Sequence, residues 1–436
     1  MMASSAFYTD RYELTMLDAA LRDEVAGRRV TFEVFSRHLP TGGRYGVFCG
    51  LGRLLDAVER FRFDGSDLDW LRQQGFLNDA TLEWLAGYRF SGDIVAYREG
   101  ELYGAGSPVL TVDGTFGEAV LLETVVLSIL NHDSAVASAG SRIVAAAGGR
   151  PVIEMGSRRT DPEAAVAAAR AAYLVGFASS SNLEAGRRYG VPTAGTAAHA
   201  FSMLYDGEEE AFRAQVAALG PGTTLLVDTY DTMAGIRHAV AAAGALLGAV
   251  RIDSGDLAAE AVAARRLLDE LGATGTQVLL TGDLGERELK ALASVPADGY
   301  GVGTAVVMGG GQPTVGFVYK LVAVGGDASE GGDASEGDEA MRPVAKQSPG
   351  KVGVAGRKWA WRLLSAAAAV GAVGPVGEET ATTDEPPTVP NRALQIPVIR
   401  GGHVVHRPPL EEIRVYHAHV REEWPVDRIL QVSRRI

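Results

Sequence analysis

The chain has 436 residues, of which 47% are hydrophobic and 22% are charged, and its formal net charge is -13 at pH 7. This composition is that of a folded globular protein, and the length favours two domains or one large barrel with additions. The acidic balance excludes a general nucleic-acid coat, and the single cysteine, Cys49, excludes an internal disulfide and a cysteine-based zinc site. A long chain without disulfides fits a reducing cytoplasm.

The N-terminal region, residues 1–140, mixes aromatic residues, charges and short turns. Within TDRYELTM, Tyr12 begins an amphipathic helix, where it either packs ordinarily or faces a planar heteroaromatic substrate. The segment 107–117 indicates strands and a turn. No targeting segment is expected at the N-terminus. The most apolar stretch, 119–130, is shorter than the about 20 residues of a membrane span, so we expect a buried helix and no membrane partner.

Between residues 150 and 305, short apolar runs alternate with Ala-rich, charged helical stretches, which favours parallel βα units. Asp161 followed by Pro162 predicts a helix start, and Asp256 opens a second helix that ends at Gly272. The apolar runs, which we expect to be strands, lie near 151–155, 175–179, 191–195, 224–228, 248–252, 276–281 and 299–303.

Each of these runs ends in polar or flexible residues. In parallel α/β folds ligands bind at the carboxyl ends of the strands, and in a barrel all these ends face one side. Loops are polar in any protein, but seven such ends in a row favour one site at a barrel mouth. The ends are Arg158-Arg159, 179–181, 196–199, Asp228, 251–256, Gly282-Asp283 and Gly303-Thr304.

Arg251 and Asp253 lie two residues apart on an expected strand, so they point to the same side. Together they would hold an anionic substrate and a metal or a cationic transition state, or else form a buried ion pair. Asp228 and Asp283 end neighbouring runs in the same way. Such carboxylates suit Mg²⁺ and a diphosphate, and helix N-capping is the alternative.

His199 lies among small residues in GTAAHAF, which leaves its ring approachable. A neutral imidazole can accept a proton or a phosphoryl group, and a structural histidine is the alternative. Gly303-Thr304 offers backbone N–H groups and a hydroxyl for a terminal phosphate, or makes a plain tight turn. Four histidines of the tail lack a carboxylate or cysteine that would complete a metal set, so we expect surface or strand positions for them: His403, His406, His417 and His419.

The last part of the chain divides into four segments. GGDASE occurs twice within 323–345, which predicts a flexible acidic loop. Residues 346–358, KQSPGKVGVAGRK, are basic and Gly-rich, and 371–392 has the composition of a linker or long surface loop. The tail, 393–436, predicts a strand pair followed by an amphipathic end.

Nine motifs together resemble nicotinate phosphoribosyltransferase, an enzyme family of NAD salvage, and they occur in the family's order through most of the chain. They are TDRYELTM, FEVFSRHLPTGGRYGVFCGL, LNHDSAVASAGSRI, EMGSRRT, GTAAHAF, LLVDTYDT, VRIDSGDL, GYGVGT and KQSPGKVGVAGRK.

The resemblance implies an irregular TIM-like α/β barrel at 141–322. It also implies a second, α+β domain, formed by residues 1–140 and by the segment 346–436 packed on them. It implies that nicotinate and 5-phosphoribosyl 1-diphosphate give nicotinate mononucleotide and diphosphate, with ATP hydrolysis coupled through a phosphohistidine and Mg²⁺ as cofactor. It further implies a cytoplasmic homodimer with shared active sites.

The resemblance also implies a role for each motif residue. His199 would be the phosphorylated histidine, and Arg251 would pair with the nicotinate carboxylate beside a hydrogen bond from Thr196. Tyr12 would stack on the nicotinate ring, and the remaining residues would hold phosphates, ribose or metal. Arg158 would contact the ribosyl phosphates, Asp253 and Asp283 the ribose hydroxyls or Mg²⁺, Gly303 and Thr304 the 5-phosphate, and Lys346, Ser348 and Lys351 a nucleotide or diphosphate.

Two positions depart from the family pattern: Met155 replaces a frequent aromatic residue and Ala200 a frequent serine. Nicotinamide phosphoribosyltransferase is the nearest alternative, and a catalytically silent nucleotide-binding barrel is an alternative of another class. Quinolinate phosphoribosyltransferase is disfavoured because its simpler chemistry needs no phosphorylatable histidine. A barrel aldolase or isomerase is disfavoured because the strand ends offer no lysine.

Overall fold

The computed structural model forms two compact units, one of residues 1–135 and 314–436 and one of residues 136–313. The second unit ends before the expected boundary at residue 322, because the strand that crosses this boundary pairs with the sheet of the first unit. The described residues are 4–39, 45–325, 341–347, 354–364, 375–381 and 391–423.

The first unit is built on a seven-stranded sheet in which every neighbouring pair is antiparallel. In its third strand, Val30, Phe32 and Val34 alternate along the chain and are buried in one apolar core, as the period of two for a strand requires. Phe32 stacks on Tyr319 of the neighbouring strand, with ring centroids 4.6 Å apart. In order across the sheet the strands are β13 (Arg342–Pro343), β12 (Phe317–Val324), β1 (Arg29–Ser36), β5 (Pro108–Thr115), β3 (Asp93–Tyr97), β17 (Gln395–Arg400) and β18 (His403–Val404).

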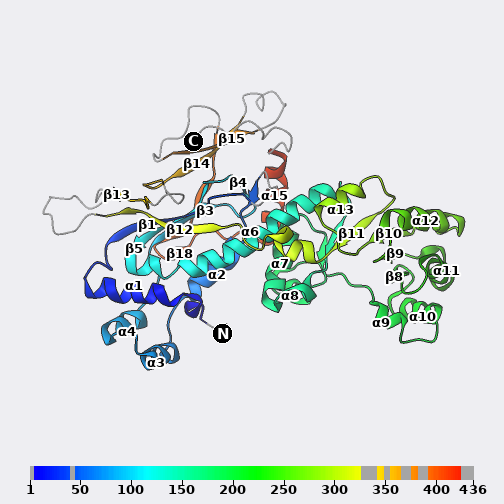
Figure 1. Cartoon of the computed structure of the whole chain (residues 1–436), viewed down its shortest axis with the longest axis horizontal. Coiled ribbons are helices and arrows are strands. Elements are labelled where there is room, and N and C mark those ends of the chain that lie inside the picture. The colour runs from blue at the N-terminus through cyan, green and yellow to red at the C-terminus, as the bar shows by residue number, and fades with distance from the viewer. Residues whose placement is uncertain are drawn as a thin grey trace. The chain divides into compact units, whose positions relative to one another are not determined.

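Two smaller sheets and the helices complete this unit (Figure 1). The small sheets have the orders β15-β14-β16 and β2-β4. Asp64 and Asp67 form a capping box that fixes the start of α3. The elements are η1 (Ala6–Tyr8), α1 (Arg11–Arg22), β2 (Gly46–Val47), α2 (Leu51–Arg60), α3 (Gly65–Gln74), α4 (Asp79–Ala86), β4 (Leu102–Tyr103), α5 (Phe116–Val120), β14 (Trp359–Leu364), β15 (Pro375–Ala381), β16 (Asn391–Ala393) and α15 (Leu410–Glu423).

The helix α6 (Glu123–Ala146) follows α5 and contains part of the apolar stretch that we expected to be buried. By length and composition alone, residues 116–146 could cross a membrane, but 61% of their most apolar window is buried within the protein. Val125, Val126 and Leu130 are completely buried in the core of the first unit. This helix therefore has the burial of a core helix.

The tail forms the predicted strand pair, β17 and β18, followed by the helix α15. Residues 375–381, which have the composition of a linker, instead form β15, an edge strand paired with β14. The linker interpretation was wrong for these residues because backbone pairing needs little side-chain preference at a sheet edge, where a proline is tolerated at the first position. Most of the expected acidic loop, residues 326–340, lies outside the described residues.

The second unit contains a six-stranded parallel sheet, so the predicted parallel βα units are confirmed. The apolar run 175–179 mostly forms the turn after α7, with only Ser179 in a strand, and the run 191–195 adds only a single bridge, from Thr193 to Ser180. Within the described residues β7 and β8 are therefore edges, and the sheet is an open half-barrel. Its strands, in order, are β7 (Ser179–Ser180), β6 (Val152–Glu154), β11 (Gly299–Val302), β10 (Gln277–Leu280), β9 (Ala249–Ile252) and β8 (Thr224–Leu226).

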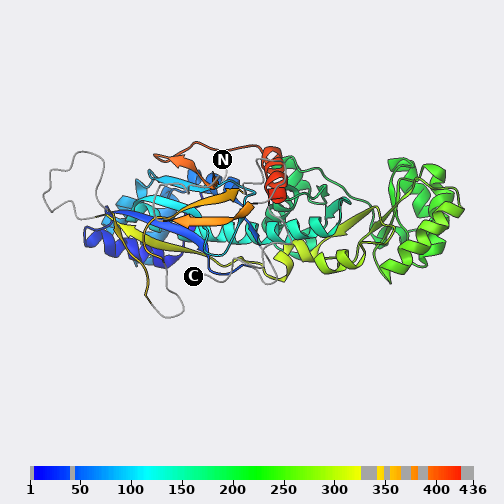
Figure 2. The same cartoon turned by 90° about the horizontal axis from the view of Figure 1, so that it is seen from above.

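Helices begin where the sequence predicts. Asp161 caps the first with Pro162 at its first position, and Asp256 caps the longest helix that lies wholly in this unit. The helices α10, α11 and α12 cluster about β8 and β9 in both views (Figures 1 and 2). The helical elements are η2 (Ser157–Arg159), α7 (Pro162–Leu174), α8 (Leu183–Tyr189), α9 (His199–Ser202), α10 (Glu208–Leu219), α11 (Thr232–Ala243), η3 (Gly244–Leu246), α12 (Leu257–Glu270), α13 (Glu286–Ala291), α14 (Thr304–Val307) and η4 (Gly309–Gly311).

Candidate active site

The carboxyl ends of β8, β9 and β10 bring several predicted residues into contact in the second unit. Arg251 lies in β9 and Asp253 directly follows it, so the two side chains leave the same side of the strand. His199 is the first residue of α9, a short helix in the connection before β8. The direct contacts among these side chains define a strand-end cluster, which consists of Thr196, His199, Asp228, Thr229, Arg251, Asp253, Ser254 and Thr281.

Arg251 and Thr196 contact each other directly in this cluster. Nη1 of Arg251 donates a hydrogen bond of 2.6 Å to Oγ1 of Thr196, whereas its Nε is buried and has no hydrogen-bond partner. Burial lowers the pKa of the guanidinium, and the carboxylates of Asp253 and Asp228 oppose that shift. A buried donor without a partner is costly, so this arginine is arranged to receive an anion rather than to form a completed ion pair.

One ring nitrogen of His199 has a hydrogen-bond partner, and the other lies on the more open side of the ring. Its Nδ1 lies 3.2 Å from Oγ1 of Thr229, within hydrogen-bond distance. Its Nε2 lies 3.9 Å from Oδ2 of Asp253, and the side chain is 38% exposed. A histidine oriented through one nitrogen, with the second nitrogen reachable, can act as a nucleophile or proton acceptor.

The two carboxylates behind His199 are held by short side-chain and backbone contacts. Thr281 donates a hydrogen bond of 2.5 Å to Asp253. Asp228 accepts hydrogen bonds from the backbone of Asp253, at 2.9 Å, and from the hydroxyl of Ser254, at 2.6 Å. The other oxygen of Asp228 is buried without a partner. These bonds fix the acceptor positions at the mouth of the sheet.

The N-capping alternative explains other aspartates, not Asp228 or Asp283. Asp231 and Asp256 cap α11 and α12, whereas α13 begins after Gly285. Asp283 is exposed and has a positive φ of 48°. A Cβ on the preceding Gly282 would lie only 2.3 Å from the carbonyl oxygen of Asp253, so the glycine lets these two backbones touch. The backbone just before Asp283 thus contacts the backbone of Asp253.

A second group of predicted residues gathers at the ends of β6 and β11. The backbone N–H of Met155 donates a hydrogen bond of 2.8 Å to the carbonyl of Val302, which joins the turn carrying Arg158 to the loop carrying Gly303. Arg158, in η2, and Thr304, the first residue of α14, are exposed. Met155 lies against Gly301, where a Cβ would be 2.8 Å from its sulfur, so the methionine covers the strand at the position of the family's aromatic residue.

The remaining predicted residues belong to the first unit or lie outside the described residues. Tyr12, on α1, is 45% exposed; burial, with Glu123 and Glu13 nearby, raises its pKa to about 12. Lys346 lines a cavity of about 330 Å³ together with Arg37, Lys320 and several apolar side chains. Ser348 and Lys351 lie outside the described residues.

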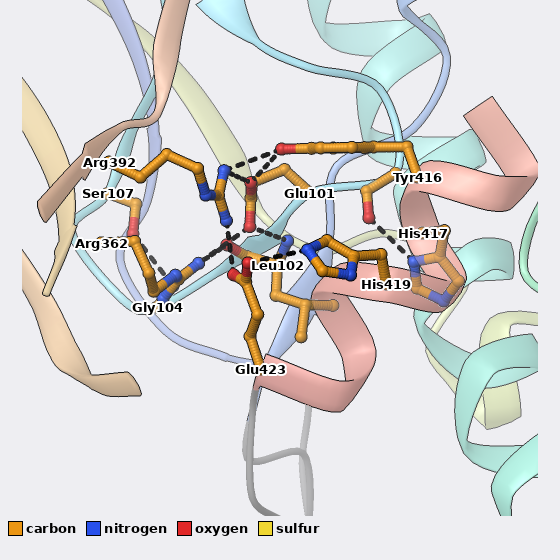
Figure 3. A network of polar contacts seen from close by, with 11 residues as sticks. Glu101, Leu102, Gly104, Ser107, Arg362, Arg392, Tyr416, His417, His419 and Glu423 are labelled. Atoms are coloured by element: carbon orange, nitrogen blue, oxygen red, sulfur yellow. Dashed lines mark hydrogen bonds and ion pairs between the residues drawn. The ribbon is translucent and has the colours of Figure 1, made fainter. Parts of the chain in front are cut away.

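Two of the tail histidines, His417 and His419, lie on α15 and contact different groups. His417 is buried, and its Nδ1 lies 2.8 Å from the carbonyl oxygen of Gly100, while Nε2 of His419 lies 3.4 Å from Glu423 (Figure 3). Burial lowers the pKa of His417 to about 4, so this ring is neutral at pH 7. The expected surface or strand position is confirmed for His403, in β18, and for the exposed His419. It was wrong for His417, which is buried in α15 because the helix packs against the loop at Gly100.

Within the described ranges no group of three or more His, Cys, Asp or Glu side chains is arranged to hold a metal ion unaided. The strand ends instead offer one buried, unpartnered carboxylate oxygen on Asp228 and the carboxylates of Asp253 and Asp283. Such hard oxygen donors fit Mg²⁺, which in proteins commonly takes one or two carboxylates and completes its shell with phosphate oxygens and water.

The hydroxyl residues that contact His199, Asp228 and Asp253 were not identified from the sequence. Thr229, Ser254 and Thr281 each follow or precede a predicted strand-end aspartate or glycine by one position, so their hydroxyls belong to the same polar ends. Proximity to a strand end was the available signal. Hydroxyls are too common in loops for that signal to distinguish a contact from a solvated side chain.

Comparison with known proteins agrees with this architecture. Residues 7–131 match the family model described as the N-terminal domain of nicotinate phosphoribosyltransferase. The chain is 54% identical over 430 residues to nicotinate phosphoribosyltransferase pncB1 of Mycobacterium tuberculosis (strain CDC 1551 / Oshkosh), covering 96% of this chain and 91% of the relative. It is 36% identical to the nicotinate phosphoribosyltransferase of Bacillus subtilis (strain 168), covering 83% and 74%. The fold matches the crystal structure of human nicotinic acid phosphoribosyltransferase with a TM-score of 0.81 at 24% identity, over 97% of this chain and 95% of that one.

Proposed function

The chain belongs to the nicotinate phosphoribosyltransferase family, and we propose that the strand-end cluster carries out this enzyme's reaction and couples it to ATP through His199. The enzyme joins nicotinate to the 5-phosphoribosyl group of 5-phosphoribosyl 1-diphosphate, giving nicotinate mononucleotide and diphosphate. One observation carries the proposal: an incompletely paired arginine, a reachable histidine and two carboxylates meet at the carboxyl edge of one parallel sheet.

Arg251 selects the acid form of the pyridine substrate. A planar guanidinium presents paired N–H donors that match a carboxylate, and the buried Nε of Arg251 lacks any other acceptor. Thr196 already accepts one bond from this arginine and so fixes the plane of the guanidinium. Nicotinamide offers only one neutral oxygen here and would bring N–H donors against a cation, so the amide is the poorer substrate.

His199 takes the γ-phosphoryl group of ATP. Its Nδ1 is occupied by Thr229, so the lone pair of Nε2 attacks phosphorus, the bond to the β-phosphate oxygen breaks, and ADP leaves. Water later hydrolyses the phosphohistidine to inorganic phosphate and regenerates the imidazole. The added negative charge on His199 tightens binding of the phosphoribosyl donor together with its cation, and hydrolysis drives the reaction toward product.

Asp253 and Asp283 lie where positive charge develops on the sugar. As the bond to diphosphate lengthens, the anomeric carbon becomes cation-like, and fixed carboxylates at a partly water-excluded edge stabilise it electrostatically. The same carboxylates would hold the ribose hydroxyls or Mg²⁺. When bound, Mg²⁺ neutralises the diphosphate leaving group.

The phosphates of the donor bind at the second group of strand ends. Arg158 supplies a cation, and Gly303 with Thr304 supplies unobstructed backbone and a hydroxyl for the 5-phosphate. In the first unit, Lys346, Arg37 and Lys320 line one cavity, and this concentration of cations suits a nucleotide or diphosphate, with Ser348 and Lys351 following in sequence. Tyr12 stacks on the nicotinate ring from the neighbouring copy of a cytoplasmic homodimer, in which each active site is shared. The half-barrel serves as an irregular TIM-like barrel.

The test is an assay of the purified protein with 5-phosphoribosyl 1-diphosphate, Mg²⁺ and either nicotinate or nicotinamide, with and without ATP. We expect nicotinate mononucleotide from nicotinate, faster turnover with ATP, and about a hundredfold lower kcat/KM for nicotinamide, because the amide loses a charge-assisted pair. Faster turnover of the amide would favour the nicotinamide enzyme. No turnover of either substrate would favour a silent nucleotide-binding barrel.

A further inference from the structure

Glu154 is a buried carboxylate at the end of β6, only 1% exposed, that the proposed reaction does not use. We propose that Glu154 is a positioning residue for the donor-phosphate site: it fixes the turn that carries Arg158 relative to the loop that carries Gly303. This inference rests on the function proposed above and adds to it one residue that touches no substrate.

Both carboxylate oxygens of Glu154 accept hydrogen bonds, one from within that turn and one from the neighbouring strand β7. The backbone N–H of Gly156 donates to Oε1. The hydroxyl of Ser180, on β7, donates to Oε2 at 2.5 Å, and the same hydroxyl accepts a bond of 2.9 Å from the backbone of Asn182. Burial raises the pKa of Glu154, and these two donors oppose that shift by stabilising the carboxylate. The carboxylate therefore links two adjacent strand ends.

The turn is held at the next residue as well. Nδ2 of Asn182 donates a bond of 3.1 Å to the hydroxyl of Ser157, the residue directly before Arg158. The turn has no room to shift on its other side. A Cβ on Gly156 would lie 2.2 Å from Val307 and 3.0 Å from the carbonyl oxygen of Gly303. Glu154 is thus the buried end of a chain of contacts. This chain sets the distance between the exposed Arg158 and the loop that carries Gly303, which is proposed to bind the 5-phosphate.

This geometry predicts a specific kinetic effect. Arg158 itself projects from a short 3₁₀ turn, η2, so its guanidinium position depends on the backbone of Gly156 and Ser157. If the carboxylate is lost, the N–H of Gly156 loses its acceptor and the turn relaxes. A displacement of about 1 Å in a group that binds the donor weakens the donor complex severely and leaves binding of nicotinate at β9 intact.

The test is the Glu154→Gln variant, assayed with nicotinate and 5-phosphoribosyl 1-diphosphate. Glutamine keeps the size but brings an amide donor against the hydroxyl of Ser180 or the N–H of Gly156. We expect KM for the donor to rise about tenfold, with KM for nicotinate and kcat changed by less than about threefold. Ser180→Ala, which removes only one donor, should shift KM for the donor in the same direction by a smaller factor.

Glu163→Gln is the matched control, because this carboxylate follows the turn on α7, is 70% exposed and pairs with Arg188 near the surface. It should leave all three constants unchanged. Equal losses in KM for both substrates, or a fall in kcat alone, would overturn the inference, as would wild-type constants in both Glu154→Gln and Ser180→Ala. If Glu154→Gln does not fold, Ser180→Ala decides. An inactive wild-type enzyme would instead contradict the proposed function.

Discussion

Two charged networks, one in each unit, differ in how their central carboxylates are paired. In the first unit, Glu101 is 0% exposed and both of its oxygens accept hydrogen bonds, from Arg362, Arg392 and Tyr416 (Figure 3), although Nε of Arg392 is buried without a partner. Burial alone would raise the pKa of Glu101, but the two guanidiniums outweigh it and lower that pKa. Arg392 extends the network to Glu423, at 2.7 Å, and so ties α15 to the sheet.

In the strand-end cluster of the second unit, some polar atoms lack hydrogen-bond partners. The Nε of Arg251 and one oxygen of Asp228 have no partner, and His199 is 38% exposed beside Asp253. Unpaired polar atoms cost stability, so their presence at the carboxyl ends of parallel strands indicates groups reserved for a ligand. We therefore expect changes in the Glu101 network to alter stability and changes in the strand-end cluster to alter activity. Variants in the two networks test this distinction.

The largest expected effect is at His199. In His199→Asn, acid-labile phosphate from labelled ATP should be lost completely, because no other side chain of the cluster is a comparable phosphoryl acceptor. Mapping of the labelled peptide measures this. His238→Asn is the control, since His238 lies in the same unit, is 41% exposed and has its Nδ1 3.2 Å from Glu208, outside the cluster. Label that persists in His199→Asn would disprove the assigned role.

The next effect is at Arg251. Arg251→Lys keeps the charge but replaces the planar guanidinium and its paired N–H donors by a single ammonium group. We therefore expect kcat/KM for nicotinate to fall about a hundredfold. The discrimination between nicotinate and nicotinamide should fall with it. Steady-state kinetics with both pyridines measure the change, and Arg266→Lys, at an 82% exposed position on α12, should have no effect. Unchanged discrimination would place carboxylate recognition elsewhere.

Glu101→Gln should change stability and leave the chemistry intact. Removing one partner leaves Arg362, 1% exposed, without its counter-charge, which costs about 3 kcal/mol of unfolding free energy. Denaturant titration measures this, and kcat and KM of the folded variant should match the wild type. Glu59→Gln, which breaks a surface pair with Arg407, should cost no more than about 0.5 kcal/mol. Equal losses in the two variants would remove the contrast between the networks.

His417 gives the smallest effect near pH 7, because its contribution to the unfolding free energy changes only as the pH falls. Its pKa is about 4 in the folded protein, against 6.5 ordinarily, so below 6.5 the unfolded chain binds a proton that the folded protein does not. The contribution of His417 to the unfolding free energy is therefore full above pH 6.5. It declines as the pH falls toward 4, by at most about 3 kcal/mol. When the unfolding free energy is measured against pH, His417→Gln should lack the part of the slope between pH 6.5 and 4 that His417 causes. His419→Gln, 70% exposed, should keep it.

Much of the site could be predicted from the sequence because its geometry is local. Arg251 and Asp253 share one side of a strand by the period of two, and GTAAHAF places His199 among small residues. The capped helices at Asp161 and Asp256 are also local features, because a side-chain oxygen satisfies N–H groups two or three residues away. The ordered motifs then identified the family, and the relatives confirm it.

The tertiary structure decided what depends on residues distant in sequence. Only strand pairing could show that the run 191–195 adds one bridge, so that the sheet stays open, and that 375–381 is an edge strand. Only the fold could bring Thr229 to His199 and show that Glu154 holds the Arg158 turn, because these contacts join separate strand ends. Periodicity and capping are set by neighbours within a few residues, whereas burial and unpaired atoms are set by whatever the rest of the chain packs against them.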